Sequence, residues 1–208
     1  MIEAVTWETA HLYGDALASQ HRLRYRLFIE RHAWDIPSYH GMEYDQYDTP
    51  AATYLIYRDR QGEARGVTRL IPTTRPYMIQ ELWPDMVQDG PLPVSERIWE
   101  GSRFGIDNDL PTAERALVGG ALVAACLEHG LAHGLDSYYV LMPSAIIRRV
   151  IGGVGCPFEW TGPAQRMGKY KVAVARVPVT RAALAAVRDA VGITRPVLVD
   201  DQPLRVAA

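Results

Sequence analysis

The sequence has few cysteines, little net charge and no long hydrophobic run. Its two cysteines, Cys126 and Cys156, lie thirty positions apart without a partner motif, which argues against a disulfide framework or a zinc site and favours a reducing compartment. The 22 basic and 24 acidic residues give a net charge of −2, so no overall field points to nucleic acid or to a membrane. No apolar run reaches the ~18 residues of a membrane span, and the first residues lack the segments of a signal peptide. These absences predict a soluble cytoplasmic protein.

The composition and pattern are those of one globular domain over residues 1–208, with 48% hydrophobic residues. Helices are predicted over 12–32, 78–83, 112–133 with Thr112 as cap, 144–150, and from a Thr180 cap to 191; strands are predicted over 53–58, 64–71, 97–106, 137–142 and 169–177. This order predicts an α/β (α+β) fold, a mixed β-sheet packed by helices on both faces. The tail after Pro196 is predicted to be poorly ordered.

Three charged residues fall inside predicted strands: Arg69 in one, and Glu100 and Arg103 in the next. Burying an unpaired charge is costly, so such charges pair with one another or with a ligand. Regular alternation places Glu100 and Arg103 on opposite faces of their strand, and Gly101 between them suits a bulge that re-aims one of them. The two interpretations are an internal polar site and a structural ion pair near a strand end.

A predicted loop carries Asp45 and Asp48, flanked by Tyr44 and Tyr47 and preceded by Trp34. The two carboxylates are interpreted either as a solvated turn or, together with the aromatic faces, as a wall that binds a cation or a flat ring such as adenine.

Metal and nucleotide motifs are incomplete in this sequence. His129 and His133 are four apart, but they lack the glutamate of the zinc-protease motif and a third ligand. They are interpreted as helix-end residues, and no metal site is predicted.

Taken together, the charged and aromatic residues of this sequence resemble those of a known family. Eight of them occur in the order and approximate spacing of the acyl-homoserine-lactone synthases, the autoinducer synthases of bacterial quorum sensing: Arg24, Phe28, Trp34, Asp45, Asp48, Arg69, Glu100 and Arg103. The stretches 69–76 and 99–104 are similar to family signatures, and the resemblance covers about residues 10–175. Gly101 departs from the larger residue that the family often has there.

The resemblance implies a fold similar to the GCN5-related N-acetyltransferases and a two-step reaction. The amine of S-adenosylmethionine attacks an acyl thioester of acyl carrier protein or CoA, and the methionine carboxylate then closes the lactone and expels methylthioadenosine. S-adenosylmethionine is thus a substrate, and no permanently bound cofactor is implied. An acetyl-CoA-dependent N-acyltransferase of the same fold is the alternative, but the nearest pyrophosphate-loop pattern, 115–120, is off by one residue and falls inside a predicted helix. A non-enzymatic binding module would leave the buried charges without a purpose.

The chemistry assigns roles to these residues. The amine must lose a proton before it attacks, and Glu100 is the first candidate for the base, with Glu43 next. Arg69 and Arg103 complete the predicted catalytic set. The resemblance implies that S-adenosylmethionine is bound by Arg24, Phe28, Trp34, Asp45, Asp48, Arg103 and Phe104. Some of the charged residues are expected to hold an N-terminal lid instead, and the sequence does not divide the two roles.

In the family, the strand before the short helix lines the acyl pocket, which here implies Tyr139, Leu141 and Met142. A Thr or Ser in this run often accompanies a preference for 3-oxo chains, because a hydroxyl can bond the extra carbonyl. Residues 138–142 include neither, so an unsubstituted, branched or aryl acyl group is expected, with an inward-pointing Tyr138 or Tyr139 as the alternative donor. Arg148 and Arg149 are interpreted as a basic patch for the acidic carrier protein or for CoA phosphates, or as a solvated helix face. Nearby in sequence are Arg166, Lys169 and Lys171.

Overall fold

A computed structural model describes residues 1–199 of the chain. Within them, a nine-stranded sheet has the order β11-β1-β4-β5-β6-β7-β10-β8, with β9 paired to β10. Its strands are β1 (Ile2–Val5), β4 (Thr53–Arg58), β5 (Ala64–Pro72), β6 (Ile98–Ile106), β7 (Ser137–Pro143), β8 (Glu159–Trp160), β9 (Gln165–Met167), β10 (Tyr170–Pro178) and β11 (Leu198–Val199). The pairs β6–β7 and β1–β11 are parallel and the others antiparallel, so the sheet is mixed. A separate hairpin is formed by β2 (Ser38–Tyr39) and β3 (Met42–Glu43).

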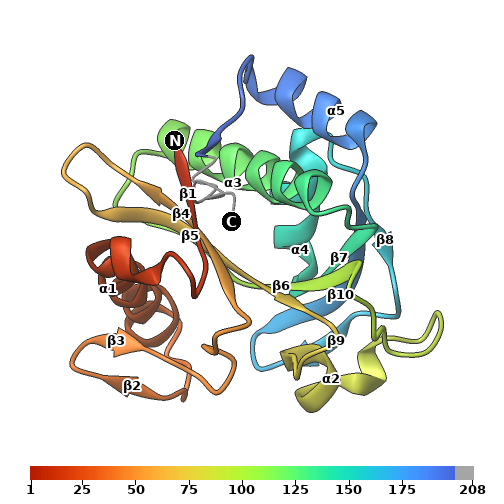
Figure 1. The fold of residues 1–208 in the computed structure, drawn as a ribbon. Helices are drawn as coiled ribbons and strands as arrows, with labels where there is room; N and C mark the ends of the chain where they lie inside the picture. The colour runs from red at the N-terminus through yellow and green to blue at the C-terminus, as the bar shows by residue number, and fades with distance from the viewer. Residues whose placement is uncertain (200–208) are drawn as a thin grey trace, which may run out of the picture.

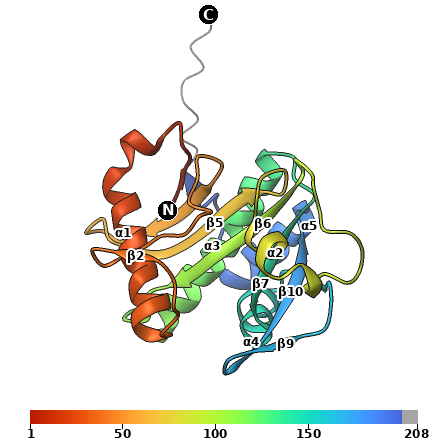
Figure 2. The ribbon, with the colours of Figure 1, turned by 90° about the horizontal axis from the view of Figure 1, so that it is seen from below.

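Helices cover both faces of the sheet (Figures 1 and 2). On one face lie α3 (Thr112–Ala132), α5 (Arg181–Val191), and α4 (Ser144–Ile146) with its π-helical continuation (Ile147–Ile151). On the other face lie α1 (Gly14–Arg24) with its π-helical continuation (Tyr25–Arg31), and α2 (Met78–Leu82). Short 3-10 turns cover Ala10–Leu12, Pro84–Met86 and Gly152–Val154. Each face has its own buried apolar cluster, so the sheet separates two cores.

Helix α3 forms the centre of one core. It packs between the sheet and α5, and a Cβ added at Gly120 would lie 2.4 Å from Cγ1 of Val191, so a glycine is needed for the two helices to approach this closely. By length and composition α3 is long and apolar enough to cross a membrane. However, 56% of the relevant window is buried inside the protein, as is usual for a core helix.

Strands β6 and β7 diverge along their length. They pair only where Ile98–Gly101 lies beside Ser137–Val140. Beyond these residues β6 continues to Ile106 and β7 to Pro143 without pairing to each other. The middle of the sheet is therefore split beyond Gly101 of β6 and Val140 of β7.

The predicted mixed sheet with helices on both faces is confirmed, and so is the Thr180 cap, whose Oγ1 accepts the N–H of Ala183 at 3.0 Å. Two details differ. Pro111, one residue earlier than predicted, occupies the cap position of α3, and its φ of −53° suits the start of a helix. The tail after Pro196 is ordered at least over β11, where Leu198–Val199 pairs with β1; residues 200–208 lie outside the described residues.

Candidate active site

Six charged side chains meet on the sheet face that carries α1 and α2, and we refer to them as the charge cluster. They are Arg24, Glu43, Asp45, Asp48, Arg69 and Arg103. They come from α1, from β3 and the loop after it, from β5 and from β6. Three guanidiniums face three carboxylates, so the formal charges cancel. The buried charges are therefore paired with one another, as their positions in apolar stretches predict.

Arg24 and Arg69 hold the carboxylates in place. Arg24 donates from Nε to Oε2 of Glu43 at 2.5 Å, and from Nη1 and Nη2 to the two oxygens of Asp48 at 2.8 and 2.9 Å. Arg69 donates to the two oxygens of Asp45 at 2.5 and 3.0 Å, and to Oδ1 of Asp48 at 2.9 Å. Both arginines are 0% exposed. Such bidentate pairs fix the carboxylate-bearing loop against α1 and the sheet.

Asp48 is the most heavily bonded carboxylate of the cluster. Burial alone would raise its pKa, but the guanidiniums of Arg24 and Arg69 and the Tyr54 hydroxyl at 2.7 Å hold the pKa well below its usual range. Its carboxylate is therefore ionised at neutral pH, with both oxygens occupied. Asp48 is suited to anchoring the loop and not to transferring a proton.

A bulge in β6 brings Arg103 into the cluster. Val67 of β5 pairs with Gly105, whereas Arg69 pairs with Ser102, so β6 contains one extra residue between these pairs. Arg103 accordingly has a φ of 53°. The Ser102 Oγ accepts the Arg69 Nε–H at 3.1 Å, so both side chains face the cluster.

The bulge gives Arg103 two carboxylate partners and an aromatic face. Its Nη2 lies 3.0 Å from Oε1 of Glu43 and 2.6 Å from Oδ2 of Asp45. Its guanidinium carbon lies 5.7 Å from the centroid of the Phe28 ring. A re-aimed side chain is thus confirmed, although the distortion lies at Arg103 and not at Gly101.

Glu100 lies outside the charge cluster. Its Oε1 and Oε2 accept the backbone N–H groups of Ile79 and Met78 at 2.7 and 3.2 Å, so it caps the start of α2. Within the described residues it forms no ion pair, and the interpretation as an ion pair with Arg103 is wrong. The side chain is 1% exposed. Desolvation raises its pKa to about 7, against the opposing effect of the two N–H donors. A carboxylate with this pKa can take up or release a proton at neutral pH.

An aromatic pair adjoins the cluster. The rings of Phe28 and Trp34 are stacked, with centroids 5.0 Å apart and planes 9° from parallel. Trp34 is 39% exposed, whereas Phe28 is buried, so one face of the pair opens to solvent. The Met78 sulfur lies 3.3 Å from both Arg69 Nη2 and Arg103 Nη1, a contact that no sequence pattern predicts. Asp45 and Asp48 are paired with buried arginines, so the solvated-turn interpretation is wrong.

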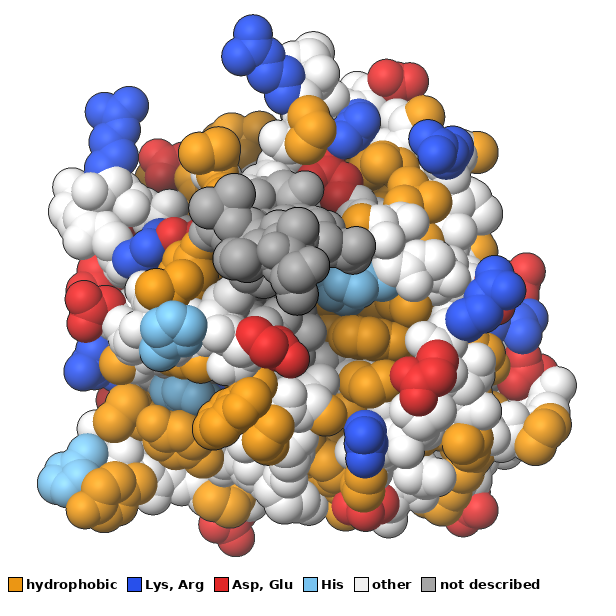
Figure 3. Space-filling model, viewed as in Figure 1, with side chains coloured by type: hydrophobic (Ala, Val, Ile, Leu, Met, Phe, Trp, Pro, Cys, Tyr) orange, Lys and Arg blue, Asp and Glu red, His pale blue; other side chains and the backbone are white. Residues whose placement is uncertain are grey.

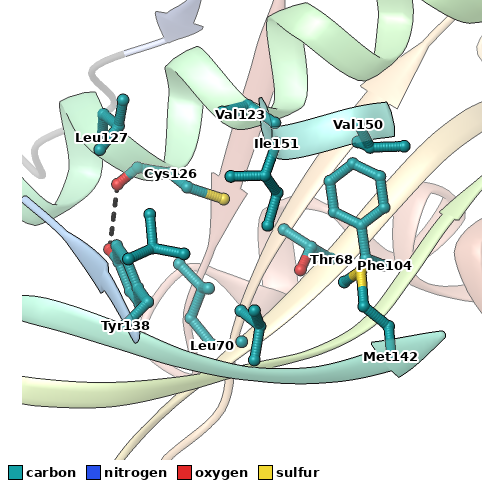
Figure 4. A pocket seen from close by; sticks show the side chains of 13 residues that line it. Thr68, Leu70, Phe104, Val123, Cys126, Leu127, Tyr138, Met142, Val150 and Ile151 are labelled. Atoms are coloured by element: carbon teal, nitrogen blue, oxygen red, sulfur yellow. Dashed lines mark hydrogen bonds between the residues drawn. The ribbon is translucent and has the colours of Figure 1, made fainter. Parts of the chain in front are cut away.

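A small apolar cavity of about 40 Å³ lies on the opposite face of the sheet, beneath α3 and the π-helical turn (Figure 4). Its walls include Thr68, Phe104, Cys126, Tyr138, Met142 and Val150. Both hydroxyls are engaged: Thr68 donates to the Ser102 carbonyl at 3.2 Å and Tyr138 to the Cys126 carbonyl at 3.0 Å.

Strand alternation divides the predicted acyl-pocket residues between the two faces of the sheet. Met142 lines the cavity, whereas Tyr139 and Leu141 lie in the apolar cluster on the α1 face. Phe104, predicted to contact S-adenosylmethionine, points into the cavity and away from the charge cluster. The cavity wall also contains Tyr138, which the sequence suggested only as an alternative hydroxyl donor.

The predicted basic patch is exposed. Arg148 and Arg149 lie on the π-helical turn, and Arg148 stacks over Trp160 at 5.4 Å from the ring centroid. Arg166 and Lys171 are cross-strand neighbours in the β9–β10 hairpin, and α4 packs on β10. The neighbouring basic charges are therefore on adjoining elements.

Of the two helix-end histidines, His129 is buried in the core and His133 is exposed. His129 is 2% exposed, and its Nδ1 lies 2.9 Å from the Tyr138 hydroxyl. Its ring stacks on His133 at 4.1 Å. Among residues 1–199, no three His, Cys, Asp or Glu side chains are grouped to hold a metal ion.

The mixed sheet, split between two parallel central strands, places this chain in the N-acetyltransferase fold class. A protein from Lactobacillus plantarum classed with the N-acetyltransferases is 13% identical and has a TM-score of 0.56 over 86% of this chain and 99% of its own. That likeness concerns the fold alone.

Closer relatives identify the family within that class. The family model described as autoinducer synthase matches residues 9–187, and this chain belongs to that family. An acyl-homoserine-lactone synthase from Vibrio anguillarum is 31% identical over 173 residues, which are 80% of this chain and 88% of the relative. The solved structure of BjaI, a CoA-dependent acyl-homoserine lactone synthase, with SAM and isopentyl-CoA is 27% identical. Its TM-score is 0.85 over 96% of this chain and 92% of that one.

Proposed function

We propose that this chain makes N-acyl-L-homoserine lactones from S-adenosylmethionine and an acyl thioester. The observation that carries the proposal is the family match over residues 9–187, which includes every member of the charge cluster, Glu100 and the aromatic pair. The solved relative with SAM and isopentyl-CoA supports both substrates. The competing pyrophosphate-loop pattern at 115–120 lies within α3, so no such loop favours an ordinary acetyltransferase.

S-adenosylmethionine binds beside the stacked pair of Phe28 and Trp34, next to Arg103. This position offers an aromatic face to the adenine ring and a guanidinium to the methionine carboxylate. Arg24 and Arg69, fully buried and saturated by carboxylates, act as positioning residues that hold the N-terminal segment in place. This assignment divides the charged residues between substrate contact and support.

Glu100 is the base of the acylation step. The ammonium group of S-adenosylmethionine gives one proton to the carboxylate. The resulting amine attacks the thioester carbonyl, the C–S bond breaks, and a second proton passes from the nitrogen to the departing thiolate, which leaves as the thiol. The pKa of Glu100, about 7, suits the first of these transfers. Glu43 is the weaker candidate, because its oxygens accept from two charged guanidiniums, those of Arg24 and Arg103, whereas the oxygens of Glu100 accept from neutral backbone N–H groups.

The lactone then closes without a further proton transfer. The methionine carboxylate attacks its own γ-carbon, the bond from that carbon to the sulfonium breaks, and methylthioadenosine leaves as a neutral thioether. A negative nucleophile and a positive leaving group cancel in this step, so the protein has to supply orientation more than acid or base.

The acyl chain enters through the split between β6 and β7 and occupies the apolar cavity. The cavity's two hydroxyls are engaged, so a 3-oxo group would lose its water without gaining a donor. The volume of about 40 Å³ is well below the ~150 Å³ of a cavity that holds benzene, which favours short straight or branched chains over aryl groups. Met142 can adjust to the chain's shape.

Acyl-CoA is the donor that the solved relative supports most directly. The exposed Arg148 and Arg149 suit CoA phosphates, and they also suit an acidic carrier protein. The test is to incubate the protein with S-adenosylmethionine and either isopentyl-CoA or the matching acyl carrier protein, and to look for the lactone by mass spectrometry. Lactone from either donor supports the function, and its absence with both, from folded protein, contradicts it.

A further inference from the structure

A second, larger cavity adjoins the far side of the charge cluster. It has a volume of about 220 Å³ and lies between β1, β4, α1 and the loop after β3. The residues on which the argument rests are Trp7, Ala10, His21, Tyr44, Asp48 and Tyr54. On the face drawn in Figure 3, hydrophobic and histidine side chains gather over α1 and the β2–β3 hairpin. Phe28 and Trp34 are absent from its walls, so it is separate from the proposed S-adenosylmethionine site.

His21 offers this cavity a fixed hydrogen-bond acceptor. The ring is 6% exposed, and Nδ1 lies 2.8 Å from the Glu43 carbonyl. A carbonyl can only accept, so Nδ1 carries the proton and Nε2 has a free lone pair. Within the described residues Nε2 forms no hydrogen bond, and His21 lines the cavity. Burial and the charge of Arg24 lower the pKa of His21 to about 4, which keeps the ring neutral at physiological pH.

Three aromatic residues also line the cavity. Tyr44 stacks on His21 with centroids 4.0 Å apart, and Tyr54 meets the His21 ring edge-on at 6.0 Å. Trp7 is 67% exposed and borders the cavity. Asp48 also lines it, but both of its oxygens are occupied by Arg24, Arg69, Tyr54 and a backbone N–H, so it cannot balance a cation.

The size of the cavity limits its ligand. A volume of 220 Å³ exceeds the ~150 Å³ that accommodates benzene and falls below the ~300 Å³ at which sites for larger ligands begin. One or two fused rings fit, whereas S-adenosylmethionine and acyl-CoA do not. Aromatic walls favour a flat ring, and a lone-pair acceptor favours a ligand that donates a hydrogen bond.

We propose that this cavity is a binding site for a neutral, flat aromatic molecule that donates one hydrogen bond, of the phenol or indole class, to Nε2 of His21. The proposal does not rest on the proposed enzymatic function, because it concerns other walls and another ligand. A bound ring would contact α1 and the loop that carries Asp48, both of which also hold the charge cluster.

Phenol and its methyl ether, anisole, are matched probes, since they differ mainly in the donor. Binding to the full-length protein is measured by ligand-detected NMR titration without substrates. We expect phenol to bind about two- to tenfold more tightly than anisole, the range for one neutral hydrogen bond. His21→Phe should remove that preference, and circular dichroism checks that the variant is folded.

A cavity-filling variant keeps the test decisive if His21→Phe fails to fold. Ala10→Phe should weaken phenol binding at least fivefold, whereas Ala185→Phe, on the exposed face of α5, should leave it unchanged. Three results would overturn the proposal. They are no phenol binding, equal affinity for phenol and anisole, and competition in which S-adenosylmethionine displaces phenol to the same extent as it fills its own site.

Discussion

Replacing Glu100 with glutamine removes a proton acceptor while keeping the side chain's shape. The carboxylate accepts N–H groups from Ile79 and Met78 at 2.7 and 3.2 Å, whereas an amide has a single acceptor oxygen. We expect methylthioadenosine release to fall by at least ~100-fold, the lower end for loss of general acid–base catalysis. Because the pKa of Glu100 is about 7, wild-type turnover should rise between pH 6 and 8 as the carboxylate forms.

The same pKa predicts a stability signature. Folding raises the pKa of Glu100 from 4.5 to about 7, so the folded state binds the proton more tightly than the unfolded state. The wild type therefore loses stability as the pH rises from 4.5 to about 7, by up to about 3 kcal/mol at ~1.4 kcal/mol per pKa unit. Glu100→Gln lacks this titration. Relative to the wild type, its free energy of unfolding should increase over that pH range.

Urea unfolding of both proteins at pH 5.0 and 7.5, beside turnover from pH 6 to 8.5, measures both effects. A cap without a raised pKa would change stability by an amount that does not depend on pH, and a purely structural cap would leave the shape of the rate profile unaltered. Near-native turnover of folded Glu100→Gln, or a difference in unfolding free energy that is independent of pH, would refute the assignment.

Four further expectations concern the other parts of the site. Arg69→Ala should lower the free energy of unfolding by about 3–5 kcal/mol, because it leaves buried carboxylates without a partner, and should reduce lactone formation at least ~100-fold. The control is Arg97→Ala, whose exposed pair with Asp136 has side chains 66% and 55% accessible, and it should lower the free energy of unfolding by less than about 1 kcal/mol. Equal losses of stability in the two variants would contradict the argument. Trp34→Ala should weaken S-adenosylmethionine binding about tenfold by calorimetry, and an unchanged affinity would remove this residue from the site. Reversing the charges of Arg148 and Arg149 should raise KM for the acyl donor and reduce its salt dependence, whereas no change would favour a solvated helix face. In competition between 3-oxo and unsubstituted thioesters of equal length, the unsubstituted one should win, and the opposite preference would show that a donor is available in the cavity.

Much of the fold was predictable because its signals are local. The period of α3, the hairpin around Asp59–Gly62 and the Thr180 cap each depend on a few neighbouring residues. The short strands β8, β9 and β11, and β1 at the start of the chain, were missed, because two to four residues carry too little periodicity. The partners of β1 and β11 are also far away in sequence.

The members of the site were predictable, but their division of labour was not. Buried charges in apolar stretches signalled a paired cluster, yet alternation along β6 gave the wrong face for Arg103 until the bulge added a residue. The cap that Glu100 provides to α2, and the Met78 sulfur against two guanidiniums, depend on how α2 packs against the sheet. No spacing in the sequence encodes those contacts.

The central claim is that one site couples acyl transfer to lactone closure on S-adenosylmethionine. The most direct measurement is the ratio of released thiol to methylthioadenosine when the protein turns over isopentyl-CoA with S-adenosylmethionine. We predict equal amounts of the two products, with no thiol release when S-adenosylmethionine is omitted. Release of thiol with transfer of the acyl group to another amine, and without methylthioadenosine, would identify an ordinary N-acyltransferase and contradict the account.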